Sequence, residues 1–229
     1  MTRRLILLRH GQTHYNATMR MQGQLDTTLS EQGHKQARLA AEVIAYRHPF
    51  ALYSSDLQRA RKTADAIGEV TGLDVHADSR LRETNLGQWQ GMSHLEVDQQ
   101  WPGARAMWRS SPQWAPPGGE SRLDVAVRTR SVVDELVDSE DWGDKHPVVM
   151  VAHGGAIAAL AAALLELSVE TFPLFNGLGN TAWAQLSAHD RGADTVSESP
   201  AAVPPTTEAA ESIRWRLDSW NVAPHLENR

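Results

Sequence analysis

Two of the ten histidines follow short apolar stretches, where their side chains could act on a bound ligand. His10 lies in Arg9-His10-Gly11 after residues 5–8, and His153 follows the apolar run 148–152 and precedes two glycines. Ligands of open α/β sheets bind beyond the carboxyl ends of strands, so both imidazoles would face a ligand there. A neutral imidazole can attack phosphorus near pH 7, and an adjacent arginine can hold phosphoryl oxygens. Each motif by itself is also compatible with a histidine that makes only a structural hydrogen bond.

An arginine and a glutamate complete the set of side chains suited to this chemistry. Arg59, in the segment Ser55-Asp56-Leu57-Gln58-Arg59, lies in the first turn of a predicted helix and could project over the same sheet edge. Glu83, in Arg82-Glu83-Thr84, could act as general acid toward a leaving oxygen. Taken singly, a solvated helix arginine and a surface glutamate are the more ordinary interpretations.

Short apolar runs alternate with helical patterns along the chain, which predicts an α/β fold. The predicted strands cover residues 5–8, 50–53, 73–76, 147–152, 181–186 and 213–217. Helices are predicted after the N-caps Ser30, Asp56 and Ser121 and over the alanine-rich residues 155–165, with Gly72 ending the second of them. This order places the chemically suited side chains at or just past strand ends.

Two segments depart from this alternation. Residues 87–119 are interrupted by Gly, Pro and four tryptophans, and Ser93 with Glu96 predicts one short helix through a capping box. We expect this segment to be a small cap inserted over the sheet edge, whose aromatic side chains pack the cap to the body. Residues 189–211, rich in Ala, Pro, Ser, Thr and Glu, are expected to form a mobile loop. We therefore expect one domain over residues 1–229.

Composition excludes several classes of protein. The 229 residues include no cysteine, which excludes disulfides, thiolate zinc sites and a cysteine nucleophile. A net charge of −6 argues against a nucleic-acid binder or a binder of anionic membranes. The apolar run at residues 5–8 lacks the length and cleavage site of a signal peptide, and no stretch approaches the ~20 apolar residues of a membrane span. We expect a cytoplasmic protein.

Taken together, the motifs resemble those of the histidine phosphatase superfamily, also called the phosphoglycerate mutase-like family. The matching positions are Arg9-His10-Gly11, Asn16, Gln22-Gly23, Ser55-Asp56-Leu57, Arg59-Ala60, Glu83 and His153-Gly154. They span most of the chain, and their joint occurrence is specific. Many members carry Glu where Gln12 stands and Trp where Tyr15 stands, and neither position has a proposed catalytic role.

The resemblance implies a role for each matching residue. His10 would be the nucleophile that becomes phosphohistidine, while Arg9, Arg59 and His153 would surround the transferring phosphoryl group. Glu83 would protonate the leaving alkoxide and then deprotonate the attacking water. The polar positions Asn16, Gln22 and Gly23 would line the same pocket. No metal or cofactor is implied, and the implied fold is a three-layer α/β/α sandwich with a mostly parallel central sheet.

Further resemblance suggests a branch of the family. His153-Gly154-Gly155 and the compact cap resemble phosphatases more than phosphoglycerate mutases. The stretches Arg20–Asp26, Leu81–Gly87 and Ser212–Asp218 imply glucosyl-3-phosphoglycerate, or a related hexosyl-3-phosphoglycerate, as the substrate. That substrate would place the enzyme in methylglucose lipopolysaccharide biosynthesis, and the resemblance implies a homodimer. A phosphoglycerate mutase, a broad-specificity phosphatase and a catalytically silent binding member are the alternatives.

Overall fold

A single six-stranded sheet forms the centre of the computed structural model, which describes residues 2–138, 142, 146–192 and 201–224. The strand order is β3-β2-β4-β1-β5-β6. The bounds are β1 Arg3–Arg9, β2 Ala51–Ser54, β3 Val75–Ala77, β4 Val148–Ala152, β5 Trp183–Asp190 and β6 Ile213–Val222. Strands β1 to β4 pair in parallel, and β5 and β6 add an antiparallel edge. Each of the six predicted strands is confirmed, with ends shifted by a few residues.

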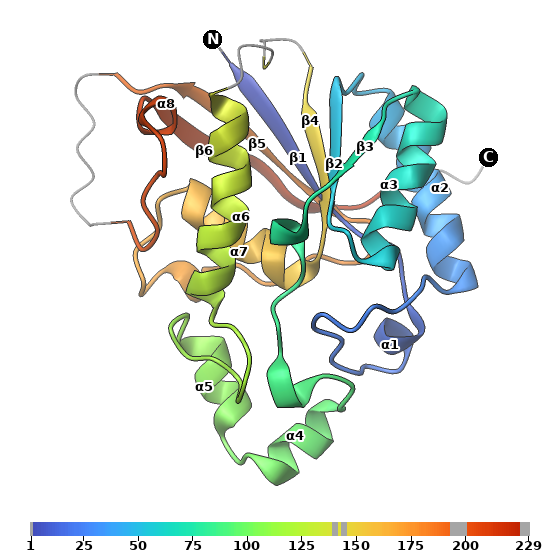
Figure 1. Ribbon diagram of the computed structural model, residues 1–229, viewed down its shortest axis with the longest axis vertical. Coiled ribbons are helices and arrows are strands. Elements are labelled where there is room, and N and C mark those ends of the chain that lie inside the picture. The colour runs from blue at the N-terminus through green and yellow to red at the C-terminus, as the bar shows by residue number, and fades with distance from the viewer. Residues whose placement is uncertain (1, 139–141, 143–145, 193–200, 225–229) are drawn as a thin grey trace.

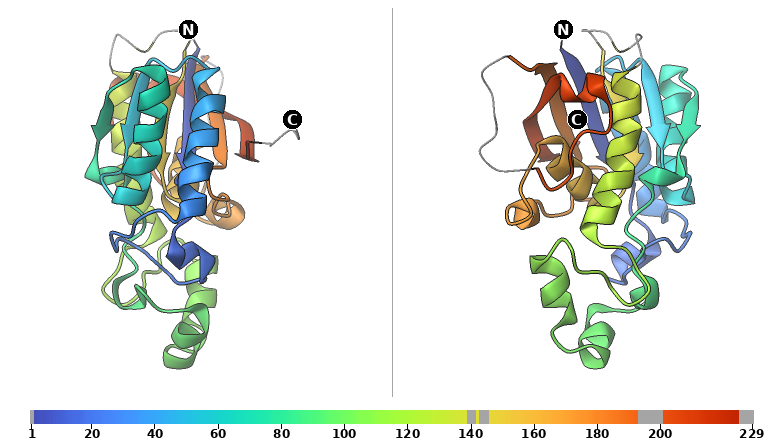
Figure 2. Two further views of the ribbon diagram at one scale, coloured as in Figure 1. Left: turned by 90° about the vertical axis from the view of Figure 1, so that its right-hand side faces the viewer. Right: turned by 60° about the vertical axis from the view of Figure 1, so that its left-hand side comes forward.

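Helices cover both faces of this sheet, as Figures 1 and 2 show. Helices α2 (Glu31–Ala45) and α3 (Gln58–Thr71) pack on the face that carries Ile6 and Leu8 of β1. Helices α6 (Arg122–Val137) and α7 (Gly154–Leu164) pack on the opposite face, against Leu5 and Leu7. Successive side chains of a strand point to opposite faces, so one apolar strand serves both cores. The predicted α/β/α sandwich is confirmed.

The start of α3 differs from the prediction. Asp56 is not the N-cap; Leu57 occupies that position without a side-chain hydrogen bond to the helix. The carboxylate of Asp56 instead accepts two hydrogen bonds from Arg82, at 2.6 and 2.8 Å. Asp26 takes over the capping role, since its Oδ1 accepts from the backbone N–H of Gln58 at 2.8 Å. The helix begins beside Asp56 as expected, but a more distant carboxylate satisfies its free donors.

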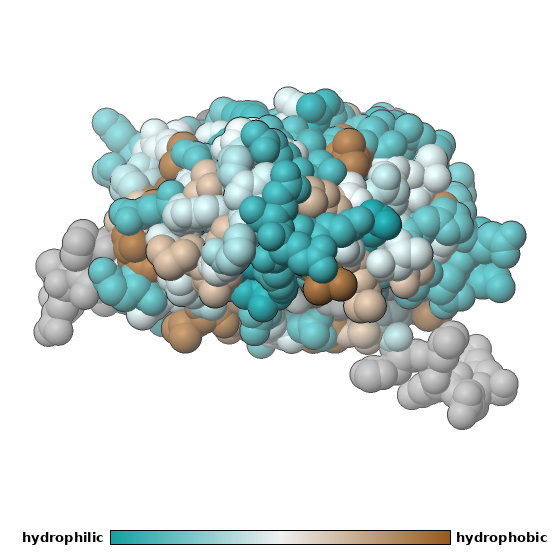
Figure 3. Space-filling view, turned by 90° about the horizontal axis from the view of Figure 1, so that it is seen from below, coloured by the Kyte–Doolittle hydropathy of each residue, from teal (hydrophilic) through white to brown (hydrophobic). Residues whose placement is uncertain are grey.

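The cap lies beyond the end of the sheet toward which β1 runs (Figure 1). It contains η2 (Gly87–Trp89), α4 (His94–Gln100) and α5 (Ala104–Ser110). The predicted capping box of Ser93 and Glu96 is present at α4, whereas α5 was not predicted. Trp89 is fully buried, with the rings of Trp101, Trp108 and Trp114 at centroid distances of 5.5 to 6.3 Å. Most of the cap's aromatic surface therefore packs inside the cap, and the surface seen from that end is mainly hydrophilic (Figure 3).

The predicted mobile loop 189–211 is only partly described. Its residues 193–200 lie outside the described residues, and residues 189–190 belong to β5. Helix α8 (Glu208–Glu211) occupies its end, capped by Thr207, and Val203 is buried. The backbone N–H and hydroxyl of Thr206 both donate to Asp134 at 2.8 Å. These contacts tie Thr206 to α6, and the mobility of the loop stays a prediction.

The remaining helical turns are α1 (His14–Ala17), η1 (Ser79–Leu81) and η3 (Phe172–Leu174). In the part of the chain that the structure describes, no helix has the length and apolar character needed to cross a bilayer.

Candidate active site

The carboxyl ends of the parallel strands open into a pocket of about 460 Å³. Seven of the eight predicted site residues line it: Arg9, His10, Asn16, Gln22, Gly23, Arg59 and Glu83. The eighth, His153, is fully buried, and its ring centroid lies 5.1 Å from that of His10. The structure therefore brings together residues from six separate parts of the sequence.

His10 is held with one ring nitrogen engaged. It follows β1, and its backbone N–H donates to the Ala152 carbonyl of β4 at 3.0 Å. Its Nδ1 lies 2.6 Å from the Gly11 carbonyl, which can only accept, so Nδ1 carries the proton and Nε2 carries the lone pair. Burial, reinforced by Arg59 and Arg9, holds the pKa of His10 well below its usual value. The imidazole is therefore neutral and nucleophilic at Nε2.

His153 is the N-cap residue of α7, in an extended backbone conformation. Neither ring nitrogen has a hydrogen-bond partner among the residues described, although the side chain is completely buried. Burial, together with the positive field of Arg59, also holds the pKa of His153 well below its usual value. A buried polar group without a partner costs free energy, so this imidazole is suited to contact a ligand.

Arg9 and Arg59 are anchored by backbone carbonyls. Arg59 donates from its two terminal nitrogens to the carbonyls of Leu25 at 2.7 Å and Gly23 at 2.8 Å, and Arg9 donates to that of Leu178. The Nε groups of both arginines are buried without partners in the described structure. Burial lowers the pKa of Arg59 to about 10, although Glu83 and Asp26 oppose the shift. Both guanidinium groups remain cationic at neutral pH and keep donors free for an anion.

The Glu83 carboxylate lies at the N-terminus of α7. Its Oε1 accepts from the backbone N–H groups of Thr84 at 2.8 Å and Ala156 at 2.9 Å, and its Oε2 accepts from that of Gly155 at 3.0 Å. Free N–H groups and the helix dipole both favour an anion at this position. The carboxylate is thus fixed in orientation on the pocket wall, at the place where a leaving oxygen or an attacking water would need it.

Asn16, Gln22 and Gly23 are positioned mainly through their oxygens. Asn16 Oδ1 accepts from the backbone N–H of Thr13 at 3.1 Å, and Gln22 Oε1 accepts from the Thr13 hydroxyl at 2.9 Å. The oxygens of both amides are therefore engaged, which leaves their NH₂ groups as donors toward the pocket. Gly23 has a positive φ of 54°, and its carbonyl accepts from Arg59. Gly23 thus acts through the arginine that it holds.

Sequence reasoning missed several residues of the site. Asn180 donates through Nδ2 to the His10 carbonyl at 3.1 Å and to Asn16 Oδ1 at 3.2 Å. Arg128 donates to the carbonyls of Arg82 at 2.7 Å and Glu83 at 3.0 Å, which holds the loop that carries the glutamate. The pocket is also lined by Arg20, Met21, Thr84, Leu86, His94, Trp108, Gly154, Gly155 and Gly177. The break before β5 at Gly179-Asn180-Thr181 was the one local signal available for Asn180.

The arrangement is suited to transfer of a phosphoryl group. Two anchored guanidinium groups, the neutral imidazole of His10 and a fixed carboxylate line one pocket, and the second neutral imidazole, that of His153, lies beside His10. Cationic donors held in place before the reaction stabilise the charge that develops on phosphoryl oxygens. The pocket thus contains candidate side chains for the nucleophile, for the charge-stabilising groups and for the proton-transfer group.

Comparison with known proteins agrees with this geometry. A model of the histidine phosphatase superfamily, branch 1, matches residues 5–199. The glucosyl-3-phosphoglycerate phosphatase of Mycolicibacterium vanbaalenii is 54% identical over 99% of this chain and 97% of its own length. The phosphoserine phosphatase 1 of Hydrogenobacter thermophilus is 34% identical over 82% of this chain and 88% of its own length. A solved structure of a mycobacterial glucosyl-3-phosphoglycerate phosphatase with VO3 is 54% identical and has a TM-score of 0.86, covering 96% of this chain and 100% of that one. The family predicted from the motifs is confirmed: the chain belongs to branch 1 of the histidine phosphatase superfamily and is a phosphatase.

Proposed function

We propose that this phosphatase hydrolyses the phosphomonoester of glucosyl-3-phosphoglycerate to glucosylglycerate and phosphate, through a phosphohistidine at His10. The observation that carries the proposed chemistry is a set of buried polar groups without partners, in the pocket wall and directly behind it. Arg9 and Arg59 line the pocket, and each has an unpartnered Nε; the unpartnered ring of His153 lies next to His10. Buried donors are normally satisfied, and a phosphoryl group offers the acceptor oxygens that they lack.

In the first step, the lone pair of His10 Nε2 attacks phosphorus, and the bond from phosphorus to the leaving oxygen breaks. Glu83, which must enter this step as the carboxylic acid, gives its proton to the departing alkoxide, which leaves as an alcohol, and Glu83 becomes a carboxylate. In the second step, Glu83 takes a proton from water while that water attacks the phosphohistidine. Phosphate departs and the lone pair returns to Nε2. Arg9, Arg59 and His153 stabilise the equatorial oxygens in both steps, so the residues need no metal ion for charge neutralisation.

The relatives support the identity of the substrate. The M. vanbaalenii protein named for glucosyl-3-phosphoglycerate is 54% identical and matches nearly end to end. The solved mycobacterial relative forms a complex with VO3, a small oxoanion of the kind that the cationic pocket accommodates. At about 460 Å³, the pocket exceeds what a phosphoryl group alone would fill, which leaves room for a larger leaving group.

Steady-state kinetics on two substrates tests this proposal. We expect kcat/KM for glucosyl-3-phosphoglycerate to exceed that for 3-phosphoglycerate by at least ~100-fold, equivalent to about 2.7 kcal/mol of transition-state stabilisation. The reason is that both compounds present the same phosphoryl group, so only contacts with the sugar can separate them. Comparable values would leave a phosphatase with a different substrate. Formation of 2-phosphoglycerate as fast as phosphate release would favour the mutase alternative.

The homodimer, the cytoplasmic location and the single domain over residues 1–229 remain predictions. A place for the product in methylglucose lipopolysaccharide biosynthesis likewise depends on the substrate test.

A further inference from the structure

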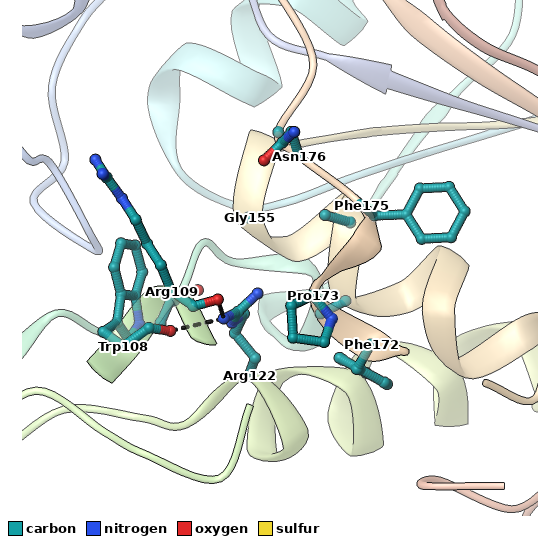
Figure 4. A pocket seen from close by; sticks show the side chains of 12 residues that line it. Trp108, Arg109, Arg122, Gly155, Phe172, Pro173, Phe175 and Asn176 are labelled. Carbon is teal, nitrogen blue, oxygen red and sulfur yellow. Dashed lines mark hydrogen bonds between the residues drawn. The ribbon is translucent and has the colours of Figure 1, made fainter. Parts of the chain in front are cut away.

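A second compartment, of about 200 Å³, lies beside the catalytic pocket. The two spaces share Thr84, Trp108, Gly155 and Gly177 as walls. In Figure 4, Trp108 and Arg109 of the cap lie on one side of the compartment, Phe172 and Pro173 of the body lie on the other, and Arg122 lies between them. Its volume is below the ~300–1,000 Å³ of typical sites for drug-sized ligands, so it suits part of a substrate.

The general acid directs the leaving group toward this compartment. A general acid must lie within hydrogen-bond reach of the oxygen that it protonates. Glu83 is held by the backbone N–H groups of Thr84 and Gly155, two residues of the wall that both spaces share. A leaving oxygen at Glu83 is therefore at the junction, and the carbon atoms attached to it can continue into the second compartment.

Arg122 brings a cation to this compartment without an anionic partner. Its Nη2 donates to the carbonyl oxygens of Trp108, at 2.6 Å, and Arg109, the bonds drawn as dashed lines in Figure 4. Its Nε is buried and has no partner within the described ranges. The Arg122 side chain is partly buried, and this burial lowers its pKa. A partly desolvated charge without a counter-charge costs free energy that an anion would recover.

The nearest carboxylates along the chain are already engaged. Glu120 forms an ion pair with Arg128 at 2.9 Å and also accepts from the backbone N–H of Asn85. Asp124 accepts from the backbone N–H and the hydroxyl of Ser121 in the capping box of α6. No ion pair of Arg122 or Arg109 occurs among the described residues, so the Arg122 guanidinium is available to an anionic ligand.

We propose that Arg122 binds a carboxylate of the leaving group in this second compartment, which makes it a specificity-determining residue. The inference rests on the proposed function, in which the leaving group is a glyceric acid derivative. Guanidinium groups match carboxylates by charge and by planar donor geometry. Because the carbonyls of Trp108 and Arg109 hold the guanidinium, the position of α5 and recognition of the carboxylate are coupled. Asn176, also on the compartment wall, adds a polar group beside this site.

Two simple phosphomonoesters test the proposal without a sugar. 3-Phosphoglycerate and glycerol 3-phosphate share a primary phosphate ester and differ in a carboxylate against a neutral hydroxymethyl group. We expect the wild-type enzyme to prefer 3-phosphoglycerate by about ten-fold or more in kcat/KM, the range of a hydrogen bond to a charged group. Arg122→Gln should remove most of that preference. Arg122→Lys should retain part of it, since lysine keeps the positive charge but lacks the planar pair of N–H donors of the guanidinium group.

Arg105→Gln is the matched control. Arg105 is a cap arginine outside both compartments, paired with Asp98, so its loss should leave the preference at the wild-type ratio. An unchanged preference in Arg122→Gln, equal losses on both esters, or no preference in the wild-type enzyme would each overturn the inference. Neither ester carries glucose, so these outcomes are distinguishable from failure of the glucosyl-3-phosphoglycerate proposal, which is measured on a different pair of substrates.

Discussion

The reactivity of His10 depends on how its two ring nitrogens are used. The Gly11 carbonyl engages Nδ1 at 2.6 Å, which leaves Nε2 as the atom that can attack phosphorus. Burial and the two arginines lower the pKa of His10, so the ring is neutral without help from a separate base. The same arginines that disfavour a protonated ring are the groups that we propose to bind the anionic substrate. In this proposal, the two positive charges control both the ionisation of His10 and the binding of substrate.

Glu83→Gln tests both steps of the proposed mechanism. Because both carboxylate oxygens accept backbone N–H bonds, the NH₂ group of glutamine must face a donor, and some loss of activity comes from this mismatch alone. Comparison of two leaving groups within the variant cancels that common loss. We expect the phosphorylation rate to fall ~10²–10⁴-fold for an alkyl phosphate and much less for p-nitrophenyl phosphate, whose leaving group needs little protonation.

The same variant should accumulate a phosphoenzyme, since water activation is also lost. Rapid quenching should then trap an acid-labile, base-stable label that peptide mapping places on His10. Equal losses for both leaving groups would exclude the acid role, and a label on another residue would exclude His10 as the nucleophile.

At the scale of elements, the start of α2 supports the catalytic loop through backbone contact. Gly33, in the first turn of α2, approaches the loop so closely that a Cβ at this position would overlap the Gln12 carbonyl oxygen. A Cβ on Gly11 would lie 2.5 Å from the Gly33 carbonyl oxygen. The contacts are between backbone atoms, so a side-chain rotation cannot relieve them. This helix and the loop that carries His10 must therefore move together.

Gly33→Ala should therefore lower both the stability and kcat. In an unconstrained helix this change stabilises by up to ~1 kcal/mol, whereas overpacking costs about 1–3 kcal/mol. Denaturant unfolding and steady-state kinetics would measure the two effects. Gln32→Ala, one residue earlier on the exposed surface of α2, is the matched control and should change neither. A stabilised and fully active Gly33→Ala enzyme would contradict the proposed support.

Local patterns predicted most elements, and contacts between distant segments explain the exceptions. Some elements could be predicted because the residues that determine them lie within a few positions of one another. Examples are the apolar runs of β1 and β4 and the helix caps at Ser30 and Ser121. The prediction of Asp56 as the N-cap of α3 was wrong because its carboxylate accepts hydrogen bonds from Arg82, which lies 26 residues away in the sequence. The N-cap residue of helix α5 is Gly103, which has a φ of 80° and makes no side-chain cap, so nothing in the sequence indicated where this helix starts.

The site residues follow the same rule. The motif residues at strand ends were predictable because the sheet order brings those ends together. Arg128 was not, since it supports Glu83 from the middle of α6, 45 residues away in the sequence, and resembles any surface arginine of a helix. The position of Arg122 against the cap carbonyls likewise depends on where the end of α5 lies relative to the first residue of α6.

At the scale of the whole molecule, the buried histidine pair connects the active site to stability. In the unfolded chain both His10 and His153 would titrate near a pKa of about 6.5, whereas in the folded protein the pKa of each is well below this value. Below about pH 6.5 the unfolded state thus binds more protons than the folded state, so the free energy of unfolding decreases as pH falls. The stabilising contribution is complete above the unfolded value and is lost progressively as pH falls from there toward the folded pKa.

Urea unfolding between pH 7.5 and 5.5 would measure this loss in the free energy of unfolding. Each histidine can contribute a slope of up to about 1.4 kcal/mol per pH unit below its unfolded pKa, and the carboxylates with lowered pKa values, such as Asp56 and Asp78, titrate below this window.

His153→Asn should flatten the slope, because asparagine does not titrate, whatever its effect on stability at pH 7.5. His34→Asn, on the exposed surface of α2, controls for removal of an imidazole and should keep the wild-type slope. If His153→Asn keeps the full slope, burial of a neutral His153 does not contribute to the pH dependence. Inorganic phosphate should raise the unfolding free energy of the wild-type enzyme at each pH, since it binds only the folded site.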